Sequence, residues 1–171
     1  MPCSRCAAAV GPAPAAAPVP AVLAFSGPGR RLLLALKYGN AKPVVRSLAG
    51  AMARQARRHE VDVVTWAPTS PSRRRHRGYD QAEVLARAVA WRLGVPCRGL
   101  LRRVDGGPPQ TGRSRHERLT GPAFVARRRV RGAVLVVDDV VTTGATLRAA
   151  EAALHQAGAR AVHCLAAAAT P

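Results

Sequence analysis

The sequence predicts an α/β fold, an open parallel sheet flanked by helices. Apolar runs of strand length, Val61–Ala67, Ala133–Val137 and Ala161–Ala167, alternate with helical segments, as in parallel strands joined by right-handed crossovers. Hydrophobic residues make up 48% of the 171 residues but aromatic residues only 4%, so Ala, Val and Leu must fill the core. Such residues suit helices packed on a sheet, and the length suits one compact domain.

The first part of the sequence predicts a short N-terminal region and the start of the domain. Residues 1–21 contain two cysteines and an Ala/Pro linker, Ala7–Pro20, and residues 22–171 are predicted to form the folded domain. A basic, Leu-rich helix is expected at Gly29–Tyr38 and a second helix at Pro43–Arg58. The strand Val61–Ala67 ends at Pro68. The Pro-, Ser- and Arg-rich stretch Thr69–Gly78 is predicted to be a loop.

The next helix carries signals at both ends. Asp80 and Glu83 have the spacing of a capping box, and the helix stops at Leu93 before Gly94. After a short strand at Leu100–Val104, the stretch Asp105–Pro122 contains four glycines and three prolines and is predicted to be a mobile loop. The strand Ala133–Val137, a helix at Thr146–Ala157 closed by Gly158, and the strand Ala161–Ala167 complete the domain.

The formal net charge of +18 has two interpretations. Such a charge is typical of a protein that binds nucleic acid or another polyanion. However, 25 of the 27 basic residues are arginines, and the chain is rich in Ala, Gly and Pro, which is also the composition that a GC-rich genome encodes. The charge alone therefore does not decide between a nucleic-acid partner and genomic bias.

Apolar segments and cysteines indicate a cytoplasmic protein without a membrane span. The longest uninterrupted apolar stretches, such as Leu32–Leu36, fall far below the roughly 20 residues that cross a bilayer. Prolines interrupt the apolar segment Ala7–Ala24 and no basic region precedes it, so a signal peptide is not expected. Four cysteines are too few for a disulfide framework in a chain of this length.

The segment Val134–Thr146 carries the strongest functional signal. Its apolar residues deliver Asp138 and Asp139 to the carboxyl end of a parallel strand, where ligands of open α/β sheets bind. Threonine hydroxyls follow, Gly144 permits a tight turn, and the N-terminus of the next helix favours an anion. A phosphate in the turn and a ribose diol on the two acids together make a 5-phosphoribosyl group. The alternatives are a magnesium site of a phosphoacceptor domain and a turn that only caps the helix.

The whole thirteen-residue segment resembles the fingerprint of type I phosphoribosyltransferases. The resemblance implies a Rossmann-like core with a small hood, built from Gly29–Tyr38 and Pro122–Val130, that selects the acceptor. It implies that Asp138 and Asp139 bind ribose hydroxyls and hold magnesium through a magnesium–ligand complex. The implied cradle for the 5-phosphate runs through Val140, Val141, Thr142, Thr143, Gly144, Ala145 and Thr146.

Further segments resemble the ComF family. These are Leu33–Gly39 (LLALKYG), Ala67–Gln81 (APTSPSRRRHRGYDQ) and Gln110–Phe124, and with the fingerprint the similarity extends from Val22 to Ala167. The resemblance implies a protein that binds phosphoribosyl pyrophosphate or a nucleotide, either as a transferase or as a non-catalytic sensor. The alternative is a competence accessory protein that handles single-stranded DNA during DNA uptake with a partner helicase. Neither the acceptor nor any catalytic residue is identified.

The sequence departs from the ComF pattern at three places: in its cysteines, at Gly78–Gln81, and near Thr120, where an Asn that usually precedes the Ala-Phe pair is missing. That family often begins with a zinc ribbon of two CxxC pairs, whereas this chain has one pair, Cys3 and Cys6. Because one pair supplies only two of four tetrahedral ligands, these cysteines are interpreted as a remnant and zinc is not expected. The family motif Gly-Phe-Asn-Gln is here Gly78–Gln81 (GYDQ), and the carboxylate argues against a phosphate contact of Asp80.

Arginines in two predicted loops form a second group of candidates. In the phosphoribosyltransferase fold the loop after the first core strand lies beside the pyrophosphate, which implies diphosphate contacts for Ser70, Arg73 and Arg77, next to Arg74 and Arg75. Guanidinium groups suit diphosphate oxygens; the alternative is a solvated basic loop. Likewise Asp105–Pro122 would be a lid that excludes water, with Gln110, Arg113, Arg115 and Arg118 either contacting ligand or facing solvent.

Overall fold

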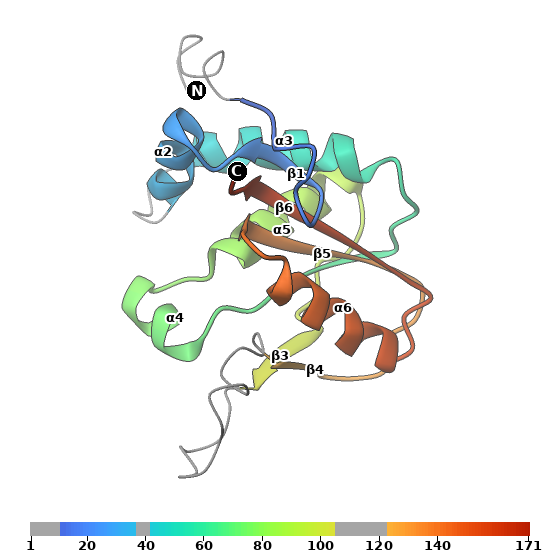
Figure 1. The fold of residues 1–171 in the computed structure, drawn as a ribbon. Coiled ribbons are helices and arrows are strands. Elements are labelled where there is room, and N and C mark those ends of the chain that lie inside the picture. Colours follow the sequence, from blue (N-terminus) through green and yellow to red (C-terminus); the bar gives the residue numbers. More distant parts are fainter. Residues whose placement is uncertain (1–10, 37–41, 105–122) are drawn as a thin grey trace.

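The central element of the fold is a parallel four-stranded sheet in the order β1-β6-β5-β2 (Figure 1). The computed structural model describes residues 11–36, 42–104 and 123–171, apart from the side chains of Arg73, His76 and Arg77. The strands are β1 (Ala21–Ala24), β2 (Val63–Trp66), β5 (Ala133–Val141) and β6 (Ala161–Ala169). This topology confirms the predicted fold class. No helix in the described ranges is long and apolar enough to cross a membrane.

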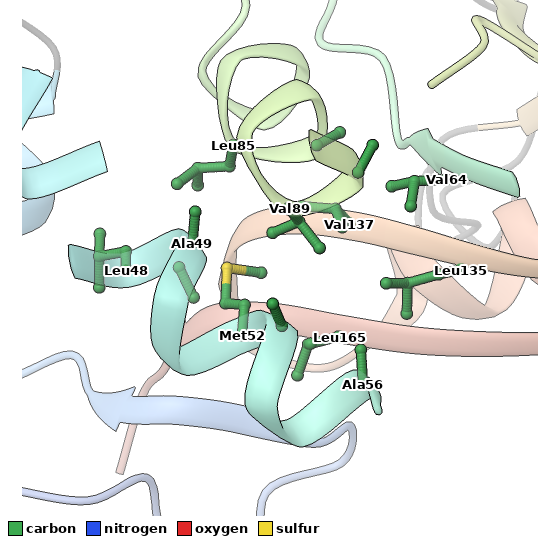
Figure 2. Packing of buried hydrophobic residues seen from close by; sticks show 14 of the residues in the cluster. Leu48, Ala49, Met52, Ala56, Val64, Leu85, Val89, Leu135, Val137 and Leu165 are labelled. Carbon is green, nitrogen blue, oxygen red and sulfur yellow. The ribbon is translucent and has the colours of Figure 1, made fainter. Parts of the chain in front are cut away.

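Helices cover both faces of the sheet because the residues of β5 alternate between two hydrophobic clusters. Leu135 and Val137 belong to the cluster under α3 (Lys42–Ala56) and α5 (Gln81–Leu93), where Met52 and Leu85 are buried with them (Figure 2). Val134 and Val136 belong to the cluster under α6 (Ala145–Gln156). Both faces of β5 are therefore closed to water, as expected for a central parallel strand.

A small antiparallel hairpin lies on the α6 side of the sheet. It pairs β3 (Leu101–Val104) with β4 (Ala123–Ala126) in the register Leu101↔Ala126. Leu101 and Phe124 are buried in the same cluster as α6. Of the segment Pro122–Val130, which was expected to contribute to a hood, the described part forms β4 and the connection to β5.

The N-terminal part of the described chain packs against the sheet edge. The strand β1 was not predicted; it pairs with β6, and the Ala24 amide donates to the Gly11 carbonyl (3.0 Å). Val19, in the stretch interpreted as a linker, is buried. The following helix, α2 (Gly27–Leu36), begins two residues earlier than predicted, and the expected end at Tyr38 lies outside the described residues.

The prediction of a loop at Thr69–Gly78 is wrong, because Pro71–Arg77 form the helix α4. Proline is favoured at the first helical position and arginine is a good helix former. The Gly78 amide closes the helix by donating to the Arg74 carbonyl (2.8 Å), and Gly78 then leaves it with a φ of 76°. The arginines of this segment therefore lie on a short helix that projects from the body of the molecule (Figure 1).

Candidate functional site

A cleft of about 430 Å³ lies at the carboxyl end of the central strand. Asp138, Asp139 and Val140 of β5 line one side of it. The segment after β2 contributes Thr69, and α5 contributes its first residues, Gln81 and Ala82. The cleft thus occupies the position at which open parallel sheets bind ligands.

The two aspartates lie within β5, which is longer than the predicted Ala133–Val137. The strand continues to Val141 because Asp138, Val140 and Val141 pair with Ala166, Ala168 and Ala169 of β6. The Asp139 amide donates to Asp138 Oδ1, and the Val140 amide donates to Asp139 Oδ1, both at 2.8 Å. Each carboxylate is therefore held in place by the next backbone amide of the strand.

The electrostatics of this pair favour a bound cation or hydrogen-bond donors. Burial, followed by the charge of the adjacent Asp139 carboxylate, raises the pKa of Asp138 well above its ordinary value, and Asp80 adds to the effect. An ionised carboxylate in such surroundings gains from any ligand that donates hydrogen bonds or brings positive charge. Ribose hydroxyl groups are ligands of the first kind.

The donor set also fits magnesium in a limited way. Carboxylate oxygens are the hard ligands that Mg²⁺ prefers, and this ion usually completes its octahedron with water and ligand phosphates. The described ranges contain no group of three or more His, Cys, Asp or Glu side chains that could hold a metal. Asp138 and Asp139 would therefore hold magnesium only together with oxygens of a bound ligand, which is the arrangement that the sequence resemblance implies.

The turn after β5 forms a second, smaller hollow of about 30 Å³ next to the cleft. Residues 140–147 line it with Asp138, and Asp138, Val140, Thr142 and Thr146 also line the cleft. The two spaces are thus adjacent. A ligand with a phosphate at one end and a polar ring beside it would extend from one into the other.

Gly144 shapes this turn. Its φ of 75° lies in the left-handed region, and a Cβ added there would lie 2.7 Å from Arg148 Nη1. Gly144 is the N-cap of α6 and no side chain caps the helix, apart from a long 3.4 Å contact of the Ala145 amide with Thr143 Oγ1. First-turn amides of α6 and the exposed hydroxyls of Thr142 and Thr143 therefore surround a position suited to an anion.

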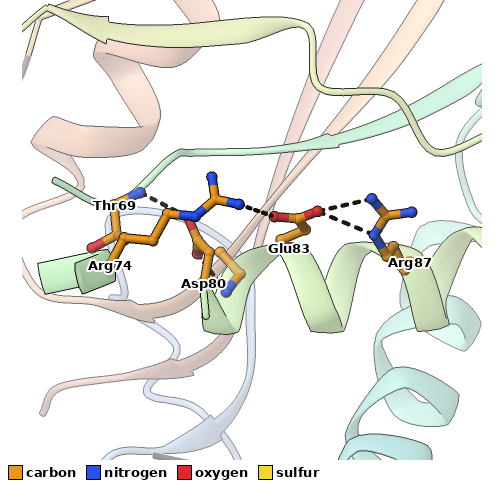
Figure 3. A network of polar contacts seen from close by, with 6 residues as sticks. Thr69, Arg74, Asp80, Glu83 and Arg87 are labelled. Carbon is orange, nitrogen blue, oxygen red and sulfur yellow. Dashed lines mark hydrogen bonds and ion pairs between the residues drawn. The ribbon is translucent and has the colours of Figure 1, made fainter. Parts of the chain in front are cut away.

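Asp80 joins the wall of the cleft to α5. The predicted cap is confirmed: Oδ1 accepts the Ala82 amide (3.1 Å), while Oδ2 accepts the Thr69 amide (2.9 Å). The side chain lines the cleft and only 4% of the residue is exposed; burial raises its pKa. Figure 3 shows this carboxylate beside Glu83, which pairs with Arg87 at 2.8 Å and approaches Arg74 at 3.8 Å.

The structure places the predicted arginine-loop candidates as follows. Ser70 lies beside Ser72, with a distance of 3.1 Å between their hydroxyl oxygens, and the neighbouring Thr69 rather than Ser70 is among the described residues that line the cleft. Arg73 and Arg77 belong to α4, but their side chains lie outside the described part of the chain. The proposed lid at Asp105–Pro122 and the cysteines Cys3 and Cys6 also lie outside it.

Some cleft residues were not singled out from the sequence. Arg103 of β3 lines the cleft, as do Phe25, just after β1, and Leu33 of α2. Arg103 reaches the site because β3 pairs with β4, a long-range contact with no local signal. Leu33, in contrast, belongs to the segment Leu33–Gly39, which resembles the ComF family, so the sequence did point to this segment.

Comparisons with known proteins agree with this geometry. A family model described as phosphoribosyl transferase domain matches residues 80–171. Glutamine phosphoribosylpyrophosphate amidotransferase from B. subtilis is 28% identical with a TM-score of 0.50; the match covers 71% of this chain but 26% of that one. No curated protein sequence matches the chain significantly.

Two smaller enzymes share the fold. Purine phosphoribosyltransferase from Pyrococcus horikoshii is 20% identical with a TM-score of 0.50, and the match covers 76% of this chain and 75% of that one. Adenine phosphoribosyltransferase from Thermoanaerobacter pseudethanolicus is 15% identical with a TM-score of 0.51, covering 75% and 81%. At these identities the likeness concerns the fold alone.

Proposed function

Because this chain belongs to the phosphoribosyl transferase domain family, we propose that its cleft binds phosphoribosyl pyrophosphate or a nucleotide through the ribose 5-phosphate group. One observation carries the proposal. The carboxylates of Asp138 and Asp139 line a cleft that adjoins the small hollow of the turn Thr142–Thr146. This order of groups, acids and then an anion site, matches a ribose diol and its 5-phosphate on one ligand.

Each group has a specific part in binding. Asp138 and Asp139 accept hydrogen bonds from the two ribose hydroxyls, which relieves the repulsion between their charges. The hydroxyls of Thr142, Thr143 and Thr146 and the first amides of α6 donate to the phosphate. Magnesium, when bound with the ligand, supplies positive charge to the diphosphate and to the two carboxylates.

The finer proposal is transfer of the phosphoribosyl group. In that reaction the bond between the anomeric carbon and the diphosphate oxygen breaks, and the electron pair leaves with pyrophosphate. A nitrogen nucleophile of the acceptor forms the new bond from the opposite face and then loses its proton to solvent. Arg103 in the cleft, with Ser70, Arg73 and Arg77 as proposed contacts on the segment after β2, would stabilise the charge that develops on the diphosphate. A sensor would bind the same ligand without this step.

Calorimetry with phosphoribosyl pyrophosphate, ribose 5-phosphate and ribose tests the proposal, with magnesium present throughout. Binding of both phosphorylated compounds, weakened together in Asp139→Asn, would support it. The proposal would be contradicted if ribose bound with the same affinity as ribose 5-phosphate. It would also be contradicted if neither phosphorylated compound bound. Release of pyrophosphate on addition of a nitrogen acceptor would then separate a transferase from a sensor.

The second candidate is a ComF-type accessory protein that handles single-stranded DNA during DNA uptake with a competence helicase. The motifs at Leu33–Gly39 and Ala67–Gln81 and the exposed arginines Arg74 and Arg75 on α4 favour it. If α4 binds single-stranded DNA, the slope of log affinity against log salt should be about 1.4 smaller for the Arg74→Ala/Arg75→Ala double variant than for wild type. This value corresponds to two lost phosphate contacts at roughly 0.7 each. An unchanged slope in anisotropy measurements would remove DNA binding from α4.

A further inference from the structure

Trp91 lies at the surface in an unusual way for its residue type. It stands in the last turn of α5, and 79% of it is exposed. Tryptophan is highly buried on average, and aromatic residues are enriched at interaction surfaces relative to the rest of the protein surface. Beside it, Gly50, Ala53, Arg54, Arg57 and Arg92 line a groove of about 320 Å³, here named the α3–α5 groove.

The groove concentrates positive charge. Arg54 is exposed on α3, Arg57 is exposed just past the end of this helix, and Arg92 follows Trp91 on α5. Within the described residues none of these three guanidinium groups forms an ion pair, and no acidic side chain lines the groove. The acidic residue of α5, Glu83, lies near its other end and is paired with Arg87.

Hydrogen bonds to backbone carbonyls hold two of these three guanidinium groups, those of Arg57 and Arg92. Arg57 Nη2 donates to the Arg92 carbonyl (2.7 Å), and Arg92 Nη2 donates to the Arg46 carbonyl (3.0 Å). Arg92 and Arg54 both lie over Gly50, where an added Cβ would be 3.5 Å from Arg92 Cζ and 3.7 Å from Arg54 Nη1. Several guanidinium groups held close together, with no carboxylate beside them, favour the binding of an anion.

We propose that the α3–α5 groove binds single-stranded nucleic acid, with a base stacked on Trp91 and phosphates on Arg54, Arg57 and Arg92. An aromatic ring next to a basic groove is the combination that binds single strands, because every base has a flat face and every linkage a charge. A protein partner fits less well. Among the described residues the other exposed large hydrophobic is Val125 of β4, so no second large side chain supplies the apolar core of an interface.

This site is separate from the phosphoribosyl cleft and does not rest on the function proposed for it. The two share no lining residue. Ala82 at the cleft and Trp91 at the groove lie nine residues apart on α5, which is about 14 Å along the helix. The groove is also separate from α4, which projects from the molecule at a distance from α3 (Figure 1).

The test is fluorescence anisotropy with a labelled oligothymidylate of about 15 nucleotides, using wild type, Trp91→Ala and Arg54→Ala. Trp91→Ala should weaken binding by at least about five-fold, the loss of one stacked base. Arg54→Ala should reduce the slope of log affinity against log salt by about 0.7. Arg102→Ala, at an exposed arginine of β3 on the α6 side of the sheet, is the matched control and should keep both values.

Two further measurements make the result specific. Inorganic polyphosphate has charge but no bases, so its affinity should be the same for wild type and Trp91→Ala. In a Trp66→Phe variant, Trp91 is the remaining tryptophan, and its fluorescence should be quenched by the oligonucleotide. Calorimetry with phosphoribosyl pyrophosphate should be unaffected by Trp91→Ala, so the two proposals can fail independently.

Several results would overturn the proposal. They are absence of oligonucleotide binding by wild type at low salt, equal affinity of Trp91→Ala and wild type, and an equal loss for oligonucleotide and polyphosphate. Sedimentation that showed a dimer dissociated by Trp91→Ala would assign the groove to a second copy of this chain instead.

Discussion

Replacing Asp80 by alanine is expected to destabilise the fold by about 1–3 kcal/mol. The carboxylate accepts the Ala82 amide at 3.1 Å as the N-cap of α5, and such a cap contributes about 1 kcal/mol. It also accepts the Thr69 amide at 2.9 Å, and a buried donor left without its partner costs about 1–3 kcal/mol. Burial raises the pKa of Asp80, so removal of the charge also relieves a desolvation cost and offsets part of the loss.

A serine at the same position separates the two contributions. In Asp80→Ser the hydroxyl can still cap α5, but the shorter side chain cannot also reach the Thr69 amide. Urea denaturation should therefore rank wild type above Asp80→Ser and Asp80→Ser above Asp80→Ala, with a constant dependence on denaturant. If Asp80→Ala lay within about 0.5 kcal/mol of wild type, which is typical of surface substitutions, the anchoring role of this carboxylate would be refuted. Equal losses in both variants would refute the capping contribution to α5, and an Asp80→Ser variant as stable as wild type would refute the contact with Thr69.

Three more predictions concern the strand and turn of the cleft. Thr143→Val should weaken binding of ribose 5-phosphate by about ten-fold or more, because a hydrogen bond to a charged group is worth roughly 1.5–3 kcal/mol; ribose binding should not change, and equal loss for both ligands in calorimetry would place Thr143 outside the phosphate site. The pKa of Asp138 is raised in the folded protein, so between the unfolded-state pKa of about 3.9 and this raised pKa the folded state keeps a proton that the unfolded state has lost. The free energy of unfolding of wild type therefore falls as pH rises through that window. Asp138→Asn should therefore be more stable than wild type at pH 7 and lose this advantage towards pH 4, whereas a difference independent of pH in denaturation series would contradict the assignment. Gly144→Ala should lower the free energy of unfolding by about 1–2 kcal/mol, because the residue has a φ of 75°. The control is Gly11→Ala, since an added Cβ there meets no atom within 4 Å and φ is not positive. Equal stability of the two variants would contradict backbone strain at position 144.

The features that sequence predicted well are those with local signals. The apolar run before Asp138 identified the central strand, and Asp80 and Gly94 marked the two ends of α5. The strand was predicted too short because aspartate is unfavourable in strands. Pairing with Ala166 and Ala168 of β6 extends β5 through both aspartates, and such tertiary contacts are not visible in a local pattern.

The missed elements depend on distant partners or on signals that were given too little weight. The short strands β1 and β4 are stabilised by residues far along the chain. In contrast, α4 had usable signals: Pro71 at the first helical position and Gly78 just past the end. The run of arginines was interpreted as a solvated loop, although arginine itself favours a helix.

The candidate site was predicted only where one segment contains it. Val140–Thr146 surrounds the small hollow because strand, turn and helix follow each other directly. Arg103 and Phe25 reach the cleft through the folding of other segments, and no spacing in the sequence connects them with Asp138.

The pairing of β1 with β6 has a consequence for how the chain folds. Ala21 is the register partner of Ala166, so nearly the whole sequence separates two neighbouring strands. Contacts between such distant segments slow folding, since a large loop must close before they form. During synthesis β1 lacks its neighbour in the sheet and β5 has only β2 beside it until β6 emerges, because β6 lies between β1 and β5. Until then the partly made chain exposes apolar strand edges that invite aggregation, and the strand that carries Asp138 is completed only when the last strand is in place.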